Sequence, residues 1–95
     1  MDERKTYEEK LQAKLDEWNE DIAKLQARAD EAREQAQDEI RERVEDLKKR
    51  REELEEELQK LRKSNLDAWS DLKAGCDRAW HAMGEAMRNA FNRHD

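Results

Sequence analysis

Apolar side chains recur at intervals of three and four residues along almost the whole chain. In the N-terminal third this spacing follows Leu11, Leu15, Trp18, Ile22, Leu25, Ala29, Ala32 and Ala36. Further on it follows Val44, Leu47, Leu54, Leu58 and Leu61, with Arg51 at an expected core position. Steps of three and four place side chains on one helical face. Two glycines and no proline leave a β-rich fold without turn residues. The pattern predicts an all-α fold of long amphipathic helices in a coiled coil, helical hairpin or bundle.

The same periodicity argues against disorder, which high charge and few aromatic residues would otherwise indicate. Charged residues make up 48% of the 95 residues and hydrophobic residues 35%. One apolar residue in three cannot wrap a compact core around so short a chain. We therefore expect the apolar face to be covered by self-association, in a homo-oligomer or with a helical partner.

Two shifts in the apolar spacing divide the chain. From Ala36 the steps to Ile40 and Val44 are both four residues, an insertion that locally unwinds a left-handed supercoil. Another step of four separates Asn65 from Trp69. We expect a long charged coiled-coil helix over 1–63, helical from about residue 2, and an amphipathic helix with 11-residue repeats over 64–95, helical over about 66–92.

The second shift coincides with helix punctuation. Ser64 and Asp67 match the S-x-x-D pattern of a helix start, and basic residues precede them, as they do at helix C-termini. A bend or tight turn here is one interpretation. The other is a continuous helix in which Asn65 fixes coiled-coil register.

The last third of the chain repeats every 11 residues. Ala68, Ala79 and Ala90 correspond, as do Trp69, Trp80 and Phe91, then Leu72 and Met83, then Cys76 and Met87. Eleven residues make almost three helical turns, so equivalent side chains share one face. The aromatic phase extends back through Leu58, Leu47, Ala36 and Leu25. The alternative is that any long amphipathic helix gives near-matches at this spacing.

Charge limits the classes of partner. Asp and Glu number 26 against 20 Lys and Arg, a net charge of −6, which argues against nucleic acid. Lys48-Lys49-Arg50-Arg51 is a basic run, but acidic residues flank it and predict a salt-paired, solvated face. The favourable i,i+4 pairs are Glu39–Arg43, Glu45–Lys49, Asp46–Arg50 and Glu56–Lys60.

The sequence also bears on location. The charged N-terminus from Met1 to Lys5 lacks the apolar region of a secretory signal, and no stretch has the length of a membrane span. A single cysteine fits a reducing compartment. We expect a cytoplasmic protein.

We predict no enzyme: no catalytic residue, no cofactor and no metal site. The carboxylates follow solvated helix, and no glycine-rich phosphate loop or nucleophile elbow is present. His81 and Glu85 are four residues apart but lack a third ligand, and His94 stands near the end of the chain. Cys76 is interpreted as a small buried hydrophobe, with a cross-link between parallel helices as the alternative.

The predicted interaction stripe collects the larger apolar residues of both segments. Its members are Leu11, Leu15, Trp18, Ile22, Leu25, Leu47, Leu54, Leu58, Leu61, Trp69, Leu72, Cys76, Trp80, Met83, Met87 and Phe91. The leading hypothesis is a non-enzymatic coiled-coil interaction or structural protein that self-associates through this stripe. A second is a membrane-surface or stress-protectant helix with Trp69, Trp80 and Phe91 facing lipid. A third is a scaffold module that presents one helix to a larger partner.

Two stretches resemble a family of small bacterial coiled-coil proteins from cyanobacteria and proteobacteria, described as stress-responsive. They are Lys14-Leu15-Asp16-Glu17-Trp18-Asn19 with Ile22, and Asp67-Ala68-Trp69-Ser70-Asp71-Leu72-Lys73-Ala74-Gly75 with Ala79-Trp80 and Gly84-Glu85-Ala86. The resemblance implies a cytoplasmic helical protein without a settled activity or catalytic residues. Cys76 stands where we would expect an aliphatic residue, so the resemblance implies no redox role. The 11-residue pattern also resembles those of exchangeable apolipoproteins and desiccation-protective proteins.

Overall fold

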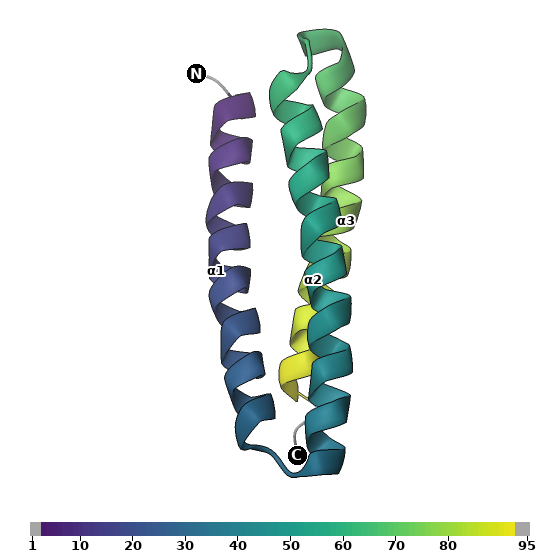
Figure 1. Ribbon diagram of the computed structural model, residues 1–95. Helices are drawn as coiled ribbons and strands as arrows, with labels where there is room; N and C mark the ends of the chain where they lie inside the picture. The colour runs from purple at the N-terminus through teal and green to yellow at the C-terminus, as the bar shows by residue number, and fades with distance from the viewer. Residues whose placement is uncertain (1–2, 93–95) are drawn as a thin grey trace.

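Residues 3–92, which the computed structural model describes, form a bundle of three helices (Figure 1). α1 spans Glu3–Glu31, α2 spans Glu34–Lys63 and α3 spans Leu66–Asn92. The rod measures 51 × 19 × 19 Å, with α1 and α3 running in one direction and α2 in the other. The predicted all-α bundle is confirmed, since this part of the chain contains no strand. None of its helices has both the length and the apolar character of a membrane span.

The core lies along the axis of the rod, where the seams of all three helices meet. Its buried members are Leu11, Leu15, Trp18, Ile22, Leu25, Val44, Leu47, Leu54, Leu58, Leu61, Cys76, Met83, Met87 and Ala90. None of these side chains is more than 8% exposed. The prediction that the apolar stripe finds no cover within the chain is therefore wrong. Two turns fold the seam back on itself, so each helix buries the stripe of its neighbours.

The predicted continuous helix over 1–63 is also wrong, because the chain turns at Ala32 and Arg33. The Ala32 N–H donates to the Ala29 carbonyl at 3.2 Å, and Arg33 is extended, with φ −67° and ψ 156°. The Gln37 side chain donates to the same carbonyl at 2.9 Å and so helps to satisfy the end of α1. Packing α1 against α2 outweighs the helical hydrogen bonds lost at the turn, since helices are stabilised mainly by their apolar faces.

The chain turns again at Ser64 and Asn65, which settles the two interpretations of this segment in favour of a turn. Ser64 ends α2: its N–H and its hydroxyl both donate to the Leu61 carbonyl, at 3.2 and 2.6 Å. Asn65 caps α3, because its Oδ1 accepts the Ala68 N–H at 2.9 Å. The predicted helix over about 66–92 matches α3, and its capping residue is Asn65, one position after the Ser64 of the S-x-x-D pattern. The Arg4 guanidinium donates to the Ser64 carbonyl at 2.9 Å and ties the start of α1 to this turn.

Arg51 occupies its predicted seam position without placing its charge in the core. Nη1 donates to Oδ1 of Asn19 on α1 at 3.0 Å, and Nε lies 3.9 Å from the Glu55 carboxylate. The aliphatic stem of an arginine can cover apolar surface while its guanidinium reaches polar partners. Arg51 therefore joins α1 to α2 at the rim of the seam.

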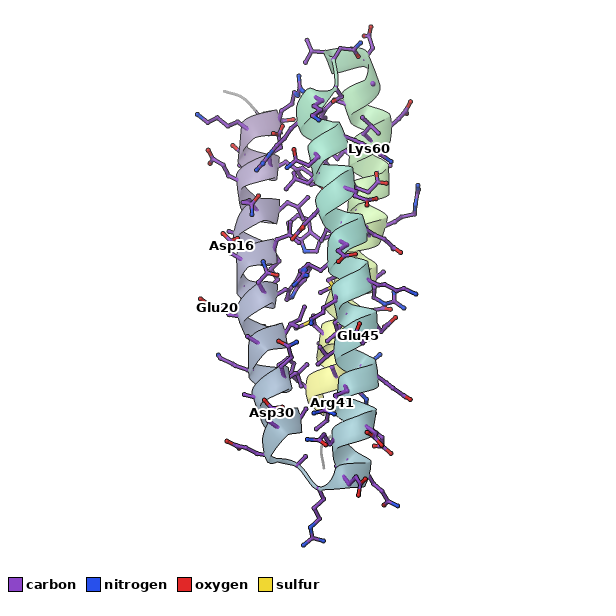
Figure 2. The ribbon with its side chains drawn as sticks, in the orientation of Figure 1. Asp16, Glu20, Asp30, Arg41, Glu45 and Lys60 are labelled. Atoms are coloured by element: carbon purple, nitrogen blue, oxygen red, sulfur yellow. The ribbon has the colours of Figure 1, made fainter. Side chains whose placement is uncertain are left out.

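Charged side chains cover the outer surfaces of the helices (Figure 2). Of the predicted i,i+4 pairs, Asp46–Arg50 closes at 3.0 Å. Asp30 and Arg41 lie 3.9 Å apart and bridge α1 and α2 beside their turn. Exposed pairs of this kind contribute only about 0–1 kcal/mol each, so the fold depends on the seam.

Gly84 on α3 faces the Trp18 ring on α1, and this contact gives a stability prediction. A Cβ at Gly84 would lie 3.8 Å from Cζ2 of Trp18, an ordinary van der Waals contact. Gly84→Ala should stabilise the bundle by about 1 kcal/mol through helix propensity, which raises Tm by roughly 4–8 °C in a domain of this size. Thermal unfolding followed by circular dichroism measures the shift.

The matched control is Gly84→Leu. Its larger side chain cannot fit against the Trp18 ring without displacing it, so Tm should fall. An equal rise in Tm for both variants would contradict the placement of Trp18 over Gly84.

Candidate interaction face

All five aromatic residues of the chain lie between α1 and α3. They are Tyr7, Trp18, Trp69, Trp80 and Phe91, and α2 has none. α2 packs closely against both neighbours, whereas the backbones of α1 and α3 stay farther apart. Aromatic side chains are large enough to span that wider separation. We call this side of the bundle, defined by the five aromatic residues, the aromatic face.

The rings of the aromatic face contact one another across the two helices. Tyr7 meets Trp69 edge-on, with ring centroids 5.8 Å apart and planes at 80°. Tyr7 also meets Trp80 at 5.8 Å and 54°. Such edge-to-face pairs are worth about 0.5–1.5 kcal/mol beyond their buried area. Tyr7 is therefore the anchor between the N-terminal half of α1 and α3.

Four of the five rings have a cation over them. Arg4 lies 5.8 Å from the Trp69 centroid, Lys14 5.5 Å from Trp18, Arg28 5.4 Å from Phe91 and Lys73 4.8 Å from Tyr7. Three of these cations come from α1 and one from α3. Cation–π contacts at partly exposed sites contribute about 0.5–1 kcal/mol each. Basic side chains thus border the aromatic face along its length.

A polar network closes the same face near Tyr7. The Tyr7 hydroxyl donates to Oδ1 of Asp77 at 2.5 Å, and the Lys73 ammonium donates to Oδ2 at 3.2 Å. Burial alone would raise the pKa of the Asp77 carboxyl, but the two hydrogen bonds and the Lys73 charge lower it overall. Burial and the adjacent carboxylate raise the pKa of Tyr7 well above its ordinary value.

Nearer the C-terminal end of α3, the aromatic face is hollowed. The hollow measures about 460 Å³, and its apolar lining includes Trp18, Trp80, Met87 and Phe91. Its charged and polar lining is Lys14, Asp21, His81 and Arg88. Another hollow, of about 370 Å³ between α2 and α3, has no aromatic side chain in its lining. An apolar base with polar edges is typical of a protein-binding surface.

Cys76 is fully buried next to this network, as its interpretation as a small hydrophobe predicted. Burial first, and then the negative charges of Glu57, Asp77 and Glu8, raise the pKa of the thiol to about 11. Thiols react as thiolates, so the burial and the raised pKa both predict slow reaction of Cys76 in the closed bundle. The alternative of a cross-link between helices would require the bundle to open.

His81 and Glu85 do not belong to any group of three possible metal ligands within residues 3–92. His81 is exposed and lines the hollow of the aromatic face. His94 lies outside the described residues. The chemistry that the described residues offer on this face is therefore apolar, aromatic and charge-based recognition.

Every residue of the predicted interaction stripe lies in the core or packs against it. Trp69, Trp80 and Phe91 face α1 instead of a lipid surface in this closed bundle. The 11-residue series was predicted to continue towards the N-terminus through Ala36. Ala36 is exposed beside the first turn, so the series of buried positions is interrupted there. The stripe omitted Tyr7, although Tyr7 stands 11 residues before Trp18, the same separation as between Trp69 and Trp80.

The lowered pKa of Asp77 predicts part of the acid sensitivity of the fold. A carboxyl whose pKa is lower in the folded state stabilises the protein above its unfolded value of about 3.9, and this contribution is lost as the pH falls through the folded pKa. Asp77→Asn should therefore lose less stability between pH 6 and pH 3 than the unmodified chain. Urea unfolding at the two pH values measures the difference.

Asp71→Asn, an exposed change on the same helix, serves as the control and should keep the full acid dependence. If the Asp77 and Asp71 variants lost stability equally on acidification, the Tyr7–Asp77–Lys73 network would not exist in solution.

The burial of Cys76 predicts slow labelling. At pH 8 an aromatic disulfide reagent should react with the native protein at least about 100-fold more slowly than with the urea-unfolded chain, because labelling must await opening of the bundle. Stopped-flow absorbance gives both rates. Equal rates would mean that Cys76 is accessible in the native state.

Comparison with known proteins leaves the role of the aromatic face to be argued from its geometry. No family model matches the chain, and neither the search of curated proteins nor the search of solved structures finds a match.

Proposed function

We propose that the protein is a non-enzymatic helical interaction protein that binds another helix through the aromatic face. The observation that carries this proposal is the gathering of all five aromatic residues where the backbones of α1 and α3 separate. Tryptophan, tyrosine and arginine are enriched at protein interfaces, and they dominate binding energy there. The hollow beside Trp80 and Phe91 is a concave surface into which apolar side chains of a partner could pack.

The proposal moves the binding surface away from the stripe that the sequence indicated. Most of that stripe is buried inside the bundle, so a second copy could use it only after unfolding. Trp80 and Phe91 remain partly exposed on the aromatic face. A homo-oligomer formed through the aromatic face, and complexes with other helical proteins, are both forms of this function.

The proposed function includes a cytoplasmic, stress-related role. The resemblance of residues 14–22 and 67–86 to stress-responsive bacterial coiled-coil proteins supports a cytoplasmic, stress-related role. The 11-residue spacing of Trp69, Trp80 and Phe91 supports a repeat that presents one ring per three helical turns.

A membrane-surface or stress-protectant function is the second candidate. Cations beside the Trp18, Trp69 and Phe91 rings match the combination of basic and aromatic side chains at lipid interfaces. Lipid binding would require α3 to leave α1 and turn its rings outward. A blue shift of tryptophan emission on adding liposomes supports this candidate, and an unchanged spectrum with neutral and anionic lipid removes it.

Site-specific photo-crosslinking tests the leading proposal. A photoreactive phenylalanine analogue replaces His81, which is exposed and lines the hollow, and a control chain carries it at Glu52 on the outside of α2. We expect a discrete adduct from position 81 and none from position 52. Mass spectrometry then shows whether the adduct is a second copy or another protein. The same adducts from both positions, or none from either, would refute binding through the aromatic face.

A further inference from the structure

We propose that the aromatic face takes an acidic amphipathic helix from another protein, an inference that rests on the proposed function and names its partner's chemistry. The chain as a whole has a net charge of −6, yet the aromatic face is bordered mainly by basic side chains. Complementary charge sets partner choice and orientation across helical interfaces. The partner helix would thus present a row of apolar residues with carboxylates on both sides of that row.

Both edges of the aromatic face are basic. On the α1 side Arg4, Lys14 and Arg28 lie over aromatic rings. On the α3 side Lys73 lies over Tyr7, and Arg88 lines the hollow opposite Lys14. These charges recur along both helices from one end of the face to the other, so they can meet a partner over its whole length.

The acidic groups at these edges are few, and most are engaged. Asp77 accepts hydrogen bonds from Tyr7 and Lys73, and Glu17 pairs with Lys14 at 3.3 Å. Asp21 is the acidic residue that lines the hollow. Pairing neutralises Lys14 and Lys73 as well as their acidic partners. The five cations of the two edges still outnumber these three acids by two.

Three other acids of α1 lie away from the aromatic face. Figure 2 shows Asp16 and Glu20 on the outer side of α1, away from the ribbons of α2 and α3. Gln12 donates to Asp16 and accepts from Arg62, so it links this outer acid to α2. Glu8 also pairs with Arg62, at 3.7 Å. At the edge of α1 that faces α3, Glu17 and Asp21 therefore stand beside Lys14 and Arg28, while these three acids lie elsewhere on the helix.

The shape of the face fits a helix better than a flat surface. Two parallel helices border it, and its hollow is lined by Trp18, Trp80, Met87 and Phe91. From Arg4 to Arg28 the edge of α1 is about 36 Å long, the length of a helix of about 24 residues. A groove between two helices accepts the apolar face of a third through anchors at i, i+3, i+4 and i+7.

A second copy of this chain does not supply such a helix. Its acidic helices are α1 and α2, but apolar residues such as Leu11 of α1 and Leu47 and Leu54 of α2 are fully buried in the bundle. Two aromatic faces brought together would oppose edges of like charge. The partner is therefore a separate acidic helix.

Designed peptides provide the test. One helical peptide of about 24 residues has leucine at heptad positions a and d and glutamate at e and g, and its matched control has lysine at e and g. Neither contains tryptophan, so the intrinsic emission of Trp18, Trp69 and Trp80 reports binding. We expect the glutamate peptide to bind roughly tenfold or more tightly than the lysine peptide, and to weaken at about 0.5 M salt.

Charge reversal on the protein sharpens the comparison. Lys14→Glu with Arg88→Glu should invert the preference, so that the lysine peptide binds more tightly. Lys49→Glu with Lys60→Glu makes the same change in net charge on exposed positions of α2 and should leave the preference unaltered. Circular dichroism confirms that each variant remains helical.

The possible results separate the two proposals. Equal binding of both peptides, or a preference that the Lys14 and Arg88 reversal leaves unchanged, overturns the acidic partner while the aromatic face remains a binding surface. If neither peptide binds but vesicles of phosphatidylcholine and phosphatidylserine do, the inference is overturned in favour of a lipid surface. If nothing binds, the acidic partner is wrong, and crosslinking from position 81 decides the proposed function separately.

Discussion

α2 packs against both α1 and α3, and the rest of the structure depends on these two interfaces. Its seam, including Leu47, Leu54 and Leu58, is fully buried and faces both neighbours. Because α2 holds the other two helices, α1 and α3 need not pack closely against each other. The wider separation between them is filled by aromatic rings and bordered by cations. The aromatic face thus exists because α2 packs closely against both neighbours, whereas α1 and α3 do not pack closely against each other.

The helices could be predicted from the sequence, but only one of the two turns could. The turn at Ser64 and Asn65 had three local signals: a shift in spacing, basic residues before it and side chains that cap helices. Near the turn at Ala32 and Arg33 the sequence shows only a shift in spacing, with no glycine, proline or side chain that caps the start of α2. Its cause is tertiary, since folding back buries the seam of α1. The same shift in an isolated pattern is equally typical of a continuous coiled coil.

Because the turn at Ala32 and Arg33 was not predicted, the aromatic face could not be predicted either. A core wrapped on all sides would need a larger share of apolar residues, whereas a rod of three helices needs only one inward-facing stripe from each helix. The network of Tyr7, Lys73 and Asp77 joins residues about 70 positions apart, which no local pattern reveals. With two turns, the equal spacing of Tyr7 and Trp18 on α1 and of Trp69 and Trp80 on α3 would have indicated matching faces. The kinds of side chain were visible in the sequence, but their pairing depended on the topology.

α3 is held by two kinds of contact that differ in strength. One kind lies in the shared core and the other on the aromatic face. In the shared core, α3 contributes fully buried Cys76 and Met83, and burying a side chain such as methionine stabilises by about 1.5–3 kcal/mol. Towards α1, many contacts are cation–π pairs and edge-on rings worth about 0.5–1.5 kcal/mol each. A partner that inserts apolar side chains between α1 and α3 would replace the weaker set and leave the seam of α2 intact. Under the proposed function, a partner would exchange contacts with the aromatic face while the shared core keeps the bundle folded.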